Sequence, residues 1–115
     1  MNVEDCLFCK IIKGEIPSST VFENDAVYAF RDINPQMPTH VLLVPKKHVS
    51  SLDEAAVLPD ADLLECIRSL SVVAKQEGLT GGYRVISNCG NDACQTVHHL
   101  HFHILGGGKM ADRMA

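Results

Sequence analysis

The chain has 115 residues, of which 46% are hydrophobic and 21% charged, and its formal net charge is −4. This length and composition are typical of a globular protein with a real core, so we expect a single domain over residues 1–115. The acidic balance and the lack of a long basic run argue against nucleic-acid binding. No apolar run is long enough to span a membrane, and the acidic N-terminus lacks a signal-peptide pattern. We therefore expect a cytoplasmic protein whose five cysteines are buried or bind metal rather than form disulfides.

The first half of the chain predicts one short helix followed by three strands. Apolar residues spaced three and four apart suit an amphipathic helix over residues 4–13. Residues 21–23 and 26–31 flank the turn pair Asn24-Asp25 and predict a β-hairpin. Residues 40–44 are apolar and rich in β-branched side chains, which predicts a central strand.

The second half predicts one long helix and two further strands. Apolar residues recur at helical spacing over residues 60–77, and Gly78 can end this helix. Residues 83–87 predict the fourth strand and residues 96–105 the fifth, with a polar loop between them. Strands, one long helix and more strands predict an α+β fold, a mostly antiparallel five-stranded sheet with helices on one face.

Residues 99–105 read His-Leu-His-Phe-His-Ile-Leu, the most informative segment of the chain. Successive side chains of a strand point to opposite faces, so His99, His101 and His103 would share one face. The apolar residues between them would pack under the long helix, and we expect the histidine face to stay open. Imidazoles on one face can supply a nucleophile, a proton donor and a phosphate clamp, or metal ligands. A purely structural role explains them poorly, because buried histidines without partners cost stability.

The pair Cys6-x-x-Cys9 has the spacing of half a zinc site. Taken alone, the same spacing also suits a redox pair in a cytosolic protein, or no function at all. Any further metal ligands must come from other parts of the chain.

Several segments together resemble one known family, the histidine triad (HIT) family, and within it the histidine triad nucleotide-binding (Hint) branch. Residues 99–105 are similar to its signature, in which three histidines alternate with apolar residues. The resemblance extends over most of the chain, through residues 8–17, 30–35, 40–48, Asn88 and Gln95-Thr96. It implies a HIT-like fold, a homodimer, and hydrolysis of purine nucleoside 5′-phosphoramidates or related nucleotide conjugates through a nucleotidyl-histidine intermediate.

The resemblance assigns catalytic roles by position. His101 corresponds to the nucleophile, and a neutral imidazole is a competent nucleophile near pH 7. His103 and Thr96 would deliver a proton to the leaving group or bind phosphate oxygens, and the sequence leaves open which does which. His40 falls where the branch has a supporting histidine near the nucleophile.

The same resemblance implies a nucleotide-binding set. Asp32 would accept hydrogen bonds from the two ribose hydroxyls, with Asn88 on the other side of the sugar. The base would lie among apolar residues, and backbone amides near Thr96 would hold phosphate oxygens. The set beyond the catalytic residues is Phe8, Ile11, Ile16, Asp32, Ile33, Asn88, Cys94 and Gln95.

A bacterial subset of the family binds a structural zinc ion, and the resemblance extends to its ligands. The corresponding residues here are Cys6, Cys9, His48 and His99. Two thiolates and two imidazoles suit tetrahedral Zn²⁺ with every position filled.

Two other functions stay open at this point. One is a nucleotide-binding regulatory module without catalysis, although an intact His101 favours an enzyme. The other is a dinucleoside polyphosphate hydrolase, although the N-terminal segments look less like that branch. The chain departs from the branch pattern at Ala93-Cys94, where glycines are usual, and at Thr96, where serine is common.

Overall fold

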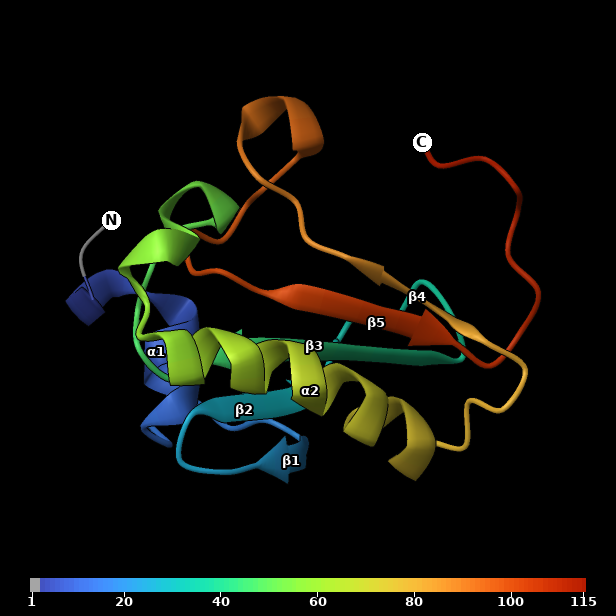
Figure 1. Cartoon of the computed structure of the whole chain (residues 1–115), viewed down its shortest axis with the longest axis horizontal. Coiled ribbons are helices and arrows are strands. Elements are labelled where there is room, and N and C mark those ends of the chain that lie inside the picture. Colours follow the sequence, from blue (N-terminus) through green and yellow to red (C-terminus); the bar gives the residue numbers. More distant parts are fainter. Residues whose placement is uncertain (1–2) are drawn as a thin grey trace.

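The computed structural model of the protein describes residues 3–115, which form one five-stranded sheet. The strands are β1 (Thr20–Glu23), β2 (Val27–Arg31), β3 (Thr39–Pro45), β4 (Tyr83–Ile86) and β5 (Phe102–Gly106). Their order across the sheet is β1-β2-β3-β5-β4, and every neighbouring pair is antiparallel (Figure 1). The predicted α+β fold with a five-stranded antiparallel sheet is confirmed.

Two α-helices pack on opposite faces of this sheet, so the expectation that the helices share one face is wrong. The helices are α1 (Leu7–Ile12) and α2 (Asp60–Gln76), with short 3₁₀ helices at η1 (Val3–Asp5), η2 (Leu52–Val57) and η3 (Asn91–Ala93). The reason lies in β3, whose run of apolar residues is buried on both sides. Val41 and Leu43 belong to the core under α2, whereas Leu42 and Val44 pack with the α1 residues.

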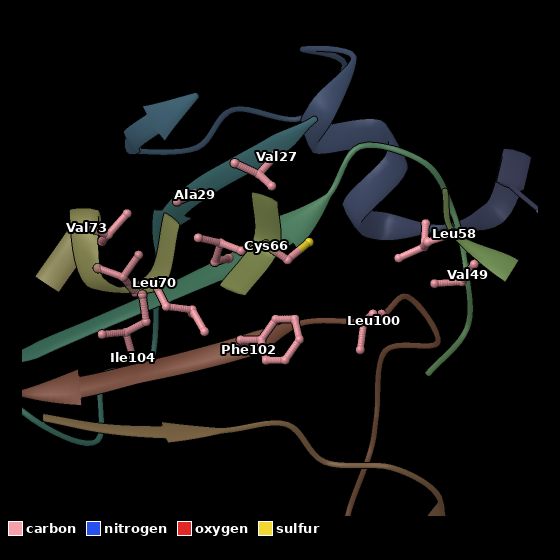
Figure 2. Packing of buried hydrophobic residues seen from close by; sticks show 12 residues of the cluster. Val27, Ala29, Val49, Leu58, Cys66, Leu70, Val73, Leu100, Phe102 and Ile104 are labelled. Carbon is pink, nitrogen blue, oxygen red and sulfur yellow. The ribbon is translucent and has the colours of Figure 1, made fainter. Parts of the chain in front are cut away.

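The long helix α2 covers the larger core. Its residues Cys66, Leu70 and Val73 cluster with Phe102 and Ile104 of β5, as Figure 2 shows. The apolar side of the histidine-rich segment therefore lies under the long helix, as predicted. The predicted end of this helix is also confirmed, because Gly78 has a φ of 72°, which ordinary residues avoid. Within residues 3–115, no helix is both long and apolar enough to cross a bilayer.

The fifth strand is shorter than predicted, since its ladder begins at Phe102 rather than at residue 96. Its pairing with β3 ends at the Leu43–Phe102 pair, two residues before Pro45. Proline has no amide hydrogen to extend a ladder, and the chain turns away after it. Single hydrogen bonds hold the residues before β5 instead: the Leu100 amide donates to Val49 O over 2.7 Å, and Ser87 Oγ donates to His101 O over 2.8 Å.

Candidate active site and metal-ligand cluster

A pocket of about 790 Å³ opens on the α1 side of the sheet. It brings together most of the predicted substrate residues, namely Phe8, Ile11, Ile16, Asp32, Ile33, Thr96, His101 and His103. The helix α1 and the segment after it supply most of the apolar lining, while Asp32 after β2, Thr96 and His101 before β5, and His103 within β5 supply polar groups. An apolar slot with a few convergent polar groups is the usual form of a small-molecule site.

Further lining residues escaped the sequence analysis. Phe30 and Leu42 also line the pocket, as do Ser18 and Ser19. Alternation along β2 and β3 would have located the first two, because Leu42 pairs directly with His103 on the same face. The two serines lie in a segment without regular structure, where no periodic pattern marks the direction of a side chain.

Three predicted residues, Asn88, Cys94 and Gln95, do not line this pocket. The Gln95 side chain is buried and holds the loop: its Nε2 donates to Ser50 O and Val97 O, and its Oε1 accepts from the Gly90 amide. Cys94 is exposed and has a φ of 62°, so it forms the left-handed end of η3. That conformation suits the glycine that is usual in the Hint branch.

The side chain of His101 is buried, with its tautomer set by the backbone. Its Nδ1 lies 2.7 Å from His99 O. A carbonyl oxygen only accepts, so Nδ1 carries the hydrogen and Nε2 keeps a free lone pair. Burial lowers the pKa of His101, which favours the neutral ring. The Phe8 ring meets His101 edge-on, with ring centres 5.1 Å apart, and limits its motion. His101 thus presents an unprotonated nitrogen on the pocket side of the sheet.

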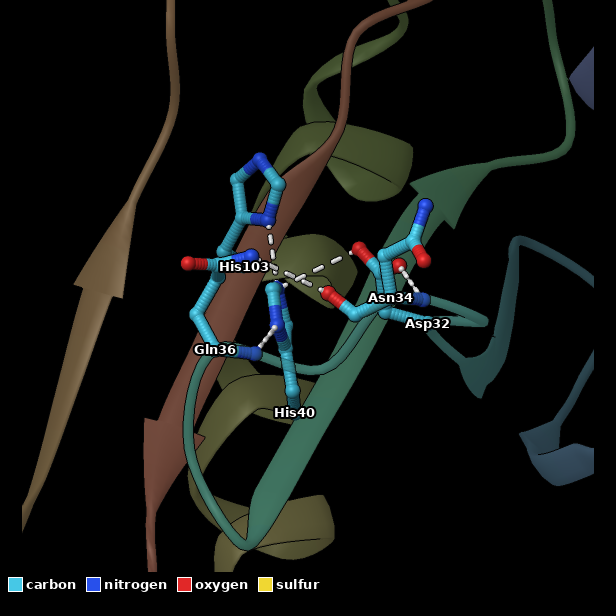
Figure 3. A network of polar contacts seen from close by, with 5 residues as sticks. All are labelled: Asp32, Asn34, Gln36, His40 and His103. Atoms are coloured by element: carbon cyan, nitrogen blue, oxygen red, sulfur yellow. Dashed lines mark hydrogen bonds and ion pairs between the residues drawn. The ribbon is translucent and has the colours of Figure 1, made fainter.

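Next to His101, the side chains of His40 and His103 contact each other (Figure 3). His40 Nε2 lies 2.8 Å from His103 Nδ1 and 3.4 Å from Asp32 Oδ2. His40 does not line the pocket itself, but it contacts a residue that does. Burial, followed by the nearby His101 and His40, lowers the pKa of His103 to about 4, although the Asp32 carboxylate opposes the shift.

The four predicted metal ligands converge at the N-terminal end of α1. The ligand atoms of Cys6, Cys9, His48 and His99 all lie within 4.8 Å of one another. Cys9 Sγ is 3.3 Å from His48 Nδ1 and 3.5 Å from His99 Nδ1, and the two imidazole nitrogens are 3.2 Å apart. Ligands of a tetrahedral zinc ion lie roughly 3.3–3.6 Å apart at ordinary bond lengths. The spacing therefore fits a four-coordinate site with little rearrangement.

Proton placement in this cluster also fits a cation. His99 Nε2 lies 2.8 Å from Pro45 O, so Nε2 carries the hydrogen and Nδ1 turns a lone pair toward the cysteines. Burial and the neighbouring Cys6 raise the pKa of Cys9 to about 12. Two buried thiols and two imidazole nitrogens are a donor set that a divalent cation satisfies.

The expectation of an open histidine face is wrong. His99 is fully buried and His101 is 7% exposed, whereas His103 is partly exposed. His99 and His101 precede the ladder of β5, where the backbone is irregular, so the three rings do not share one face. The rings of His101 and His103 stay in contact, with centres 5.2 Å apart. His99 turns into the cysteine cluster, and the other two face the pocket.

Comparison with known proteins places this geometry in a family. The family model described as HIT domain matches residues 13–110. The chain belongs to the HIT family. A 14 kDa zinc-binding protein of Zea mays is 50% identical over 106 residues, which are 90% of this chain and 83% of that protein. The adenylylsulfatase HINT1 of Arabidopsis thaliana is 46% identical over 106 residues, covering 90% of this chain and 72% of that protein.

Solved structures agree with this assignment. A HIT family hydrolase from Clostridium thermocellum superposes with a TM-score of 0.90 at 42% identity, covering 99% of this chain and 100% of that one. A histidine triad protein from Clostridium difficile superposes with a TM-score of 0.88 at 46% identity, covering 98% and 99%. The resemblance found in the sequence and the HIT-like fold are confirmed, and the relatives support a hydrolase.

The low pKa of His103 predicts that acid destabilises the protein. Its pKa is about 4 in the folded state and near 6.5 when unfolded, so between these values the unfolded chain binds more protons. The stability that depends on neutral His103 is complete above pH 6.5 and is lost as the pH falls toward 4. We expect urea unfolding to show a smaller free-energy loss from pH 7 to pH 4.5 in His103→Asn than in wild type.

The measurement is the difference between the two proteins, because His48 and His99, whose pKa values burial also lowers, are present in both. If the free energy of unfolding depends on pH equally in the two proteins, folding does not lower the pKa of His103.

Proposed function

We propose that this HIT domain is a hydrolase of purine nucleoside 5′-phosphoramidates or related nucleotide conjugates, and that it works through a nucleotidyl-histidine intermediate. The observation that carries the proposal is the free Nε2 of His101 beside an apolar pocket that also holds Asp32. A binding module has no need of a nitrogen kept unprotonated at this place. The names of its relatives, a HIT family hydrolase and an adenylylsulfatase, support hydrolysis at a nucleotide phosphorus.

The first chemical step uses the backbone arrangement of His101. Its Nε2 lone pair attacks the α-phosphorus, and the bond from phosphorus to the amine breaks with its electron pair going to nitrogen, which takes up a proton. The attacking ring becomes cationic, and its Nδ1 hydrogen stays bonded to His99 O. That carbonyl stabilises the positive charge as it forms. Water then attacks phosphorus, the bond to His101 breaks, and the nucleoside monophosphate leaves with the ring neutral again.

The other residues that line the pocket would bind the ribose and the base of the nucleotide. The Asp32 carboxylate accepts one hydrogen bond from the Asn34 amide over 2.8 Å, and each oxygen has a lone pair left for a ribose hydroxyl. Phe8, Ile11, Ile16 and Ile33 form the apolar base pocket, and Ile33 is 93% exposed at its edge, available to cover a bound base. Positioning of the phosphate against His101 is the main task of such a site.

Replacement of His101 tests the proposed reaction directly. We expect His101→Ala to lower turnover of adenosine 5′-phosphoramidate by at least about 10³-fold, because the nucleophile is lost. Mass spectrometry of quenched wild-type protein should find the nucleotidyl group on His101. A folded wild type that binds adenosine monophosphate without turnover would leave the regulatory module as the function. Faster turnover of diadenosine polyphosphates than of phosphoramidates would favour the third alternative.

We also propose that Cys6, Cys9, His48 and His99 hold a structural Zn²⁺ ion. When bound, zinc supplies a tie between α1 and the segment before β5, since its ligands come from both. Similarity to a 14 kDa zinc-binding protein supports this identity of the metal. The chain contributes four ligands, which leaves no open position for catalysis.

Metal analysis checks the zinc proposal. We expect about one zinc ion per chain in protein purified without chelator. Cys9→Ser should lose most of the metal and several kcal/mol of stability, because binding energy at such a site is folding energy. Cys66→Ser is the matched control, since this buried thiol lies in the core under α2 and outside the cluster. Zinc content well below one per chain, or a stable metal-free Cys9→Ser, would contradict the proposal.

The Hint resemblance further leads us to propose a homodimer. In the single chain β4 is an edge strand, with Tyr83 and Val85 exposed. The outer side of α2 exposes Leu64 and Ile67. An unpaired strand edge and exposed apolar residues on a helix are features that a two-fold interface covers.

Light scattering at micromolar concentration tests the dimer. We expect a mass twice that of one chain for wild type. Ile67→Glu should shift it toward one chain, because a charge would be buried at the interface. Val57→Glu, at an exposed position on η2, should leave the dimer intact. A monomeric wild type would refute the proposal.

A further inference from the structure

The sequence leaves two roles open for His103, proton donor or phosphate ligand, and the loop before β3 decides between them. Two backbone amides of residues 32–40 point at side chains of the site (Figure 3). The Asn34 amide donates to Asp32 Oδ1 over 2.8 Å, and the Gln36 amide donates to His40 Nδ1 over 3.0 Å. A backbone amide can only donate, so the atom that accepts each of these hydrogen bonds carries no hydrogen.

The Gln36 contact determines where His40 carries its hydrogen. Because His40 Nδ1 accepts, it has no hydrogen, and in the neutral ring the hydrogen is on Nε2. His40 Nε2 lies 2.8 Å from His103 Nδ1, so it donates there. His103 Nδ1 therefore accepts, and the only hydrogen of neutral His103 is on its own Nε2. Figure 3 shows that nitrogen on the side of the ring away from His40.

We propose that the Gln36 amide, acting through His40, holds His103 as a neutral Nε2–H hydrogen-bond donor, so that His103 binds a phosphate oxygen and does not protonate the leaving group. This assignment rests on the proposed function only for the identity of the ligand. A charged His103 would carry hydrogens on both nitrogens and would place Nδ1–H against the Nε2–H of His40. Relief of that clash needs a hydrogen on His40 Nδ1, where the Gln36 amide already points.

The charged and titratable groups around His103 are consistent with this state. His40 and His101 both disfavour a charge on the ring, and Asp32 alone favours it. Asp32 lies nearest to His40, 3.4 Å from Nε2, so its attraction acts on the hydrogen that His40 already carries. Leu42, the direct partner of His103 on β3, brings no charge to the ring.

The same contact argues against a second metal site. Ligand atoms of Asp32, His40 and His103 come within 4.8 Å of one another, a grouping that suits some metals. A metal on His40 Nε2 would force the hydrogen of the neutral ring onto Nδ1, opposite the Gln36 amide 3.0 Å away. The group is therefore a chain of hydrogen bonds that runs from the Gln36 amide through His40 to His103.

The chemical consequence concerns the leaving amine. A neutral His103 that gave up its Nε2 hydrogen would become an imidazolate, which is too basic to form here. His103 thus stabilises charge on a phosphoryl oxygen without transferring a proton. The amine takes its proton from water, directly or through the Thr96 hydroxyl, which lines the same pocket.

NMR of ¹⁵N-histidine-labelled, zinc-loaded protein tests the tautomers without any substrate. At pH 7 we expect His40 and His103 both as neutral rings with hydrogen on Nε2. Gln36→Ala keeps the amide and should leave this pattern unchanged, whereas Gln36→Pro removes the amide and should release the Nδ1–H form of His40. A charged ring or an Nδ1–H tautomer on either histidine in wild type would overturn the proposal, even if Gln36→Pro fails to fold.

Kinetics with the His103 variants give an independent readout. Glutamine places an N–H near the position of Nε2 but cannot act as an acid at pH 7. We expect His103→Gln to stay within about 10-fold of wild-type kcat and His103→Ala to fall about 100-fold, the usual effect of losing one such donor. Both losses should be equal for alkylamine and arylamine substrates. Failure of glutamine to rescue, with a larger loss for the poorer alkylamine leaving group, would show that His103 is the acid. If wild type has no turnover, the proposed reaction fails, yet the spectra still decide the state of His103.

Discussion

Antiparallel pairing of β3 with β5 is the constraint on which the rest of the structure depends. The Leu42–His103 and His40–Leu105 pairs put the rings of His40 and His103 diagonally on one face. The ends of the same pairing bring His48, just after β3, beside His99, just before β5. A register slip of one residue would turn His103 into the core under α2 and separate both histidine pairs. The candidate active site and the metal-ligand cluster are therefore two results of one strand alignment.

Backbone groups then give chemically similar histidines different functions. Carbonyl oxygens of Pro45 and His99 place the hydrogen of His99 on Nε2 and that of His101 on Nδ1. The Gln36 amide has the opposite effect and leaves His40 Nδ1 without a hydrogen. Under the proposed function, side chains of one residue type would thus serve as a metal ligand through Nδ1, a nucleophile through Nε2 and a hydrogen-bond donor. None of these tautomers requires a charged ring, because each contact is a hydrogen bond that a neutral imidazole can make.

The sequence predicts the elements and most of the pocket because both follow from periodicity and from a distinctive motif. Phe8, Asp32 and His101 meet as the resemblance implies. Alternation along residues 96–105 did not predict where the ladder stops, since that depends on Pro45 of another strand. It also did not predict burial of His99, which is decided by a helix 90 residues away in sequence. The Gln36 contact is invisible in the sequence because the backbone amide donates it and any residue but proline would supply it.

His99 links the metal-ligand cluster to the candidate active site. Its ring belongs to the cysteine cluster, while its carbonyl oxygen holds Nδ1 of His101 over 2.7 Å. A ring fixed by Pro45 O on one side and by the cluster on the other restrains the His99 backbone as well. The position and tautomer of His101 are thus coupled to the packing of α1, although Cys6 and Cys9 do not line the pocket. A structural metal at this place would affect catalysis only by keeping the His99 carbonyl in position. Groups outside the reaction centre can raise the reaction rate in this way, because they hold the reacting side chain in place.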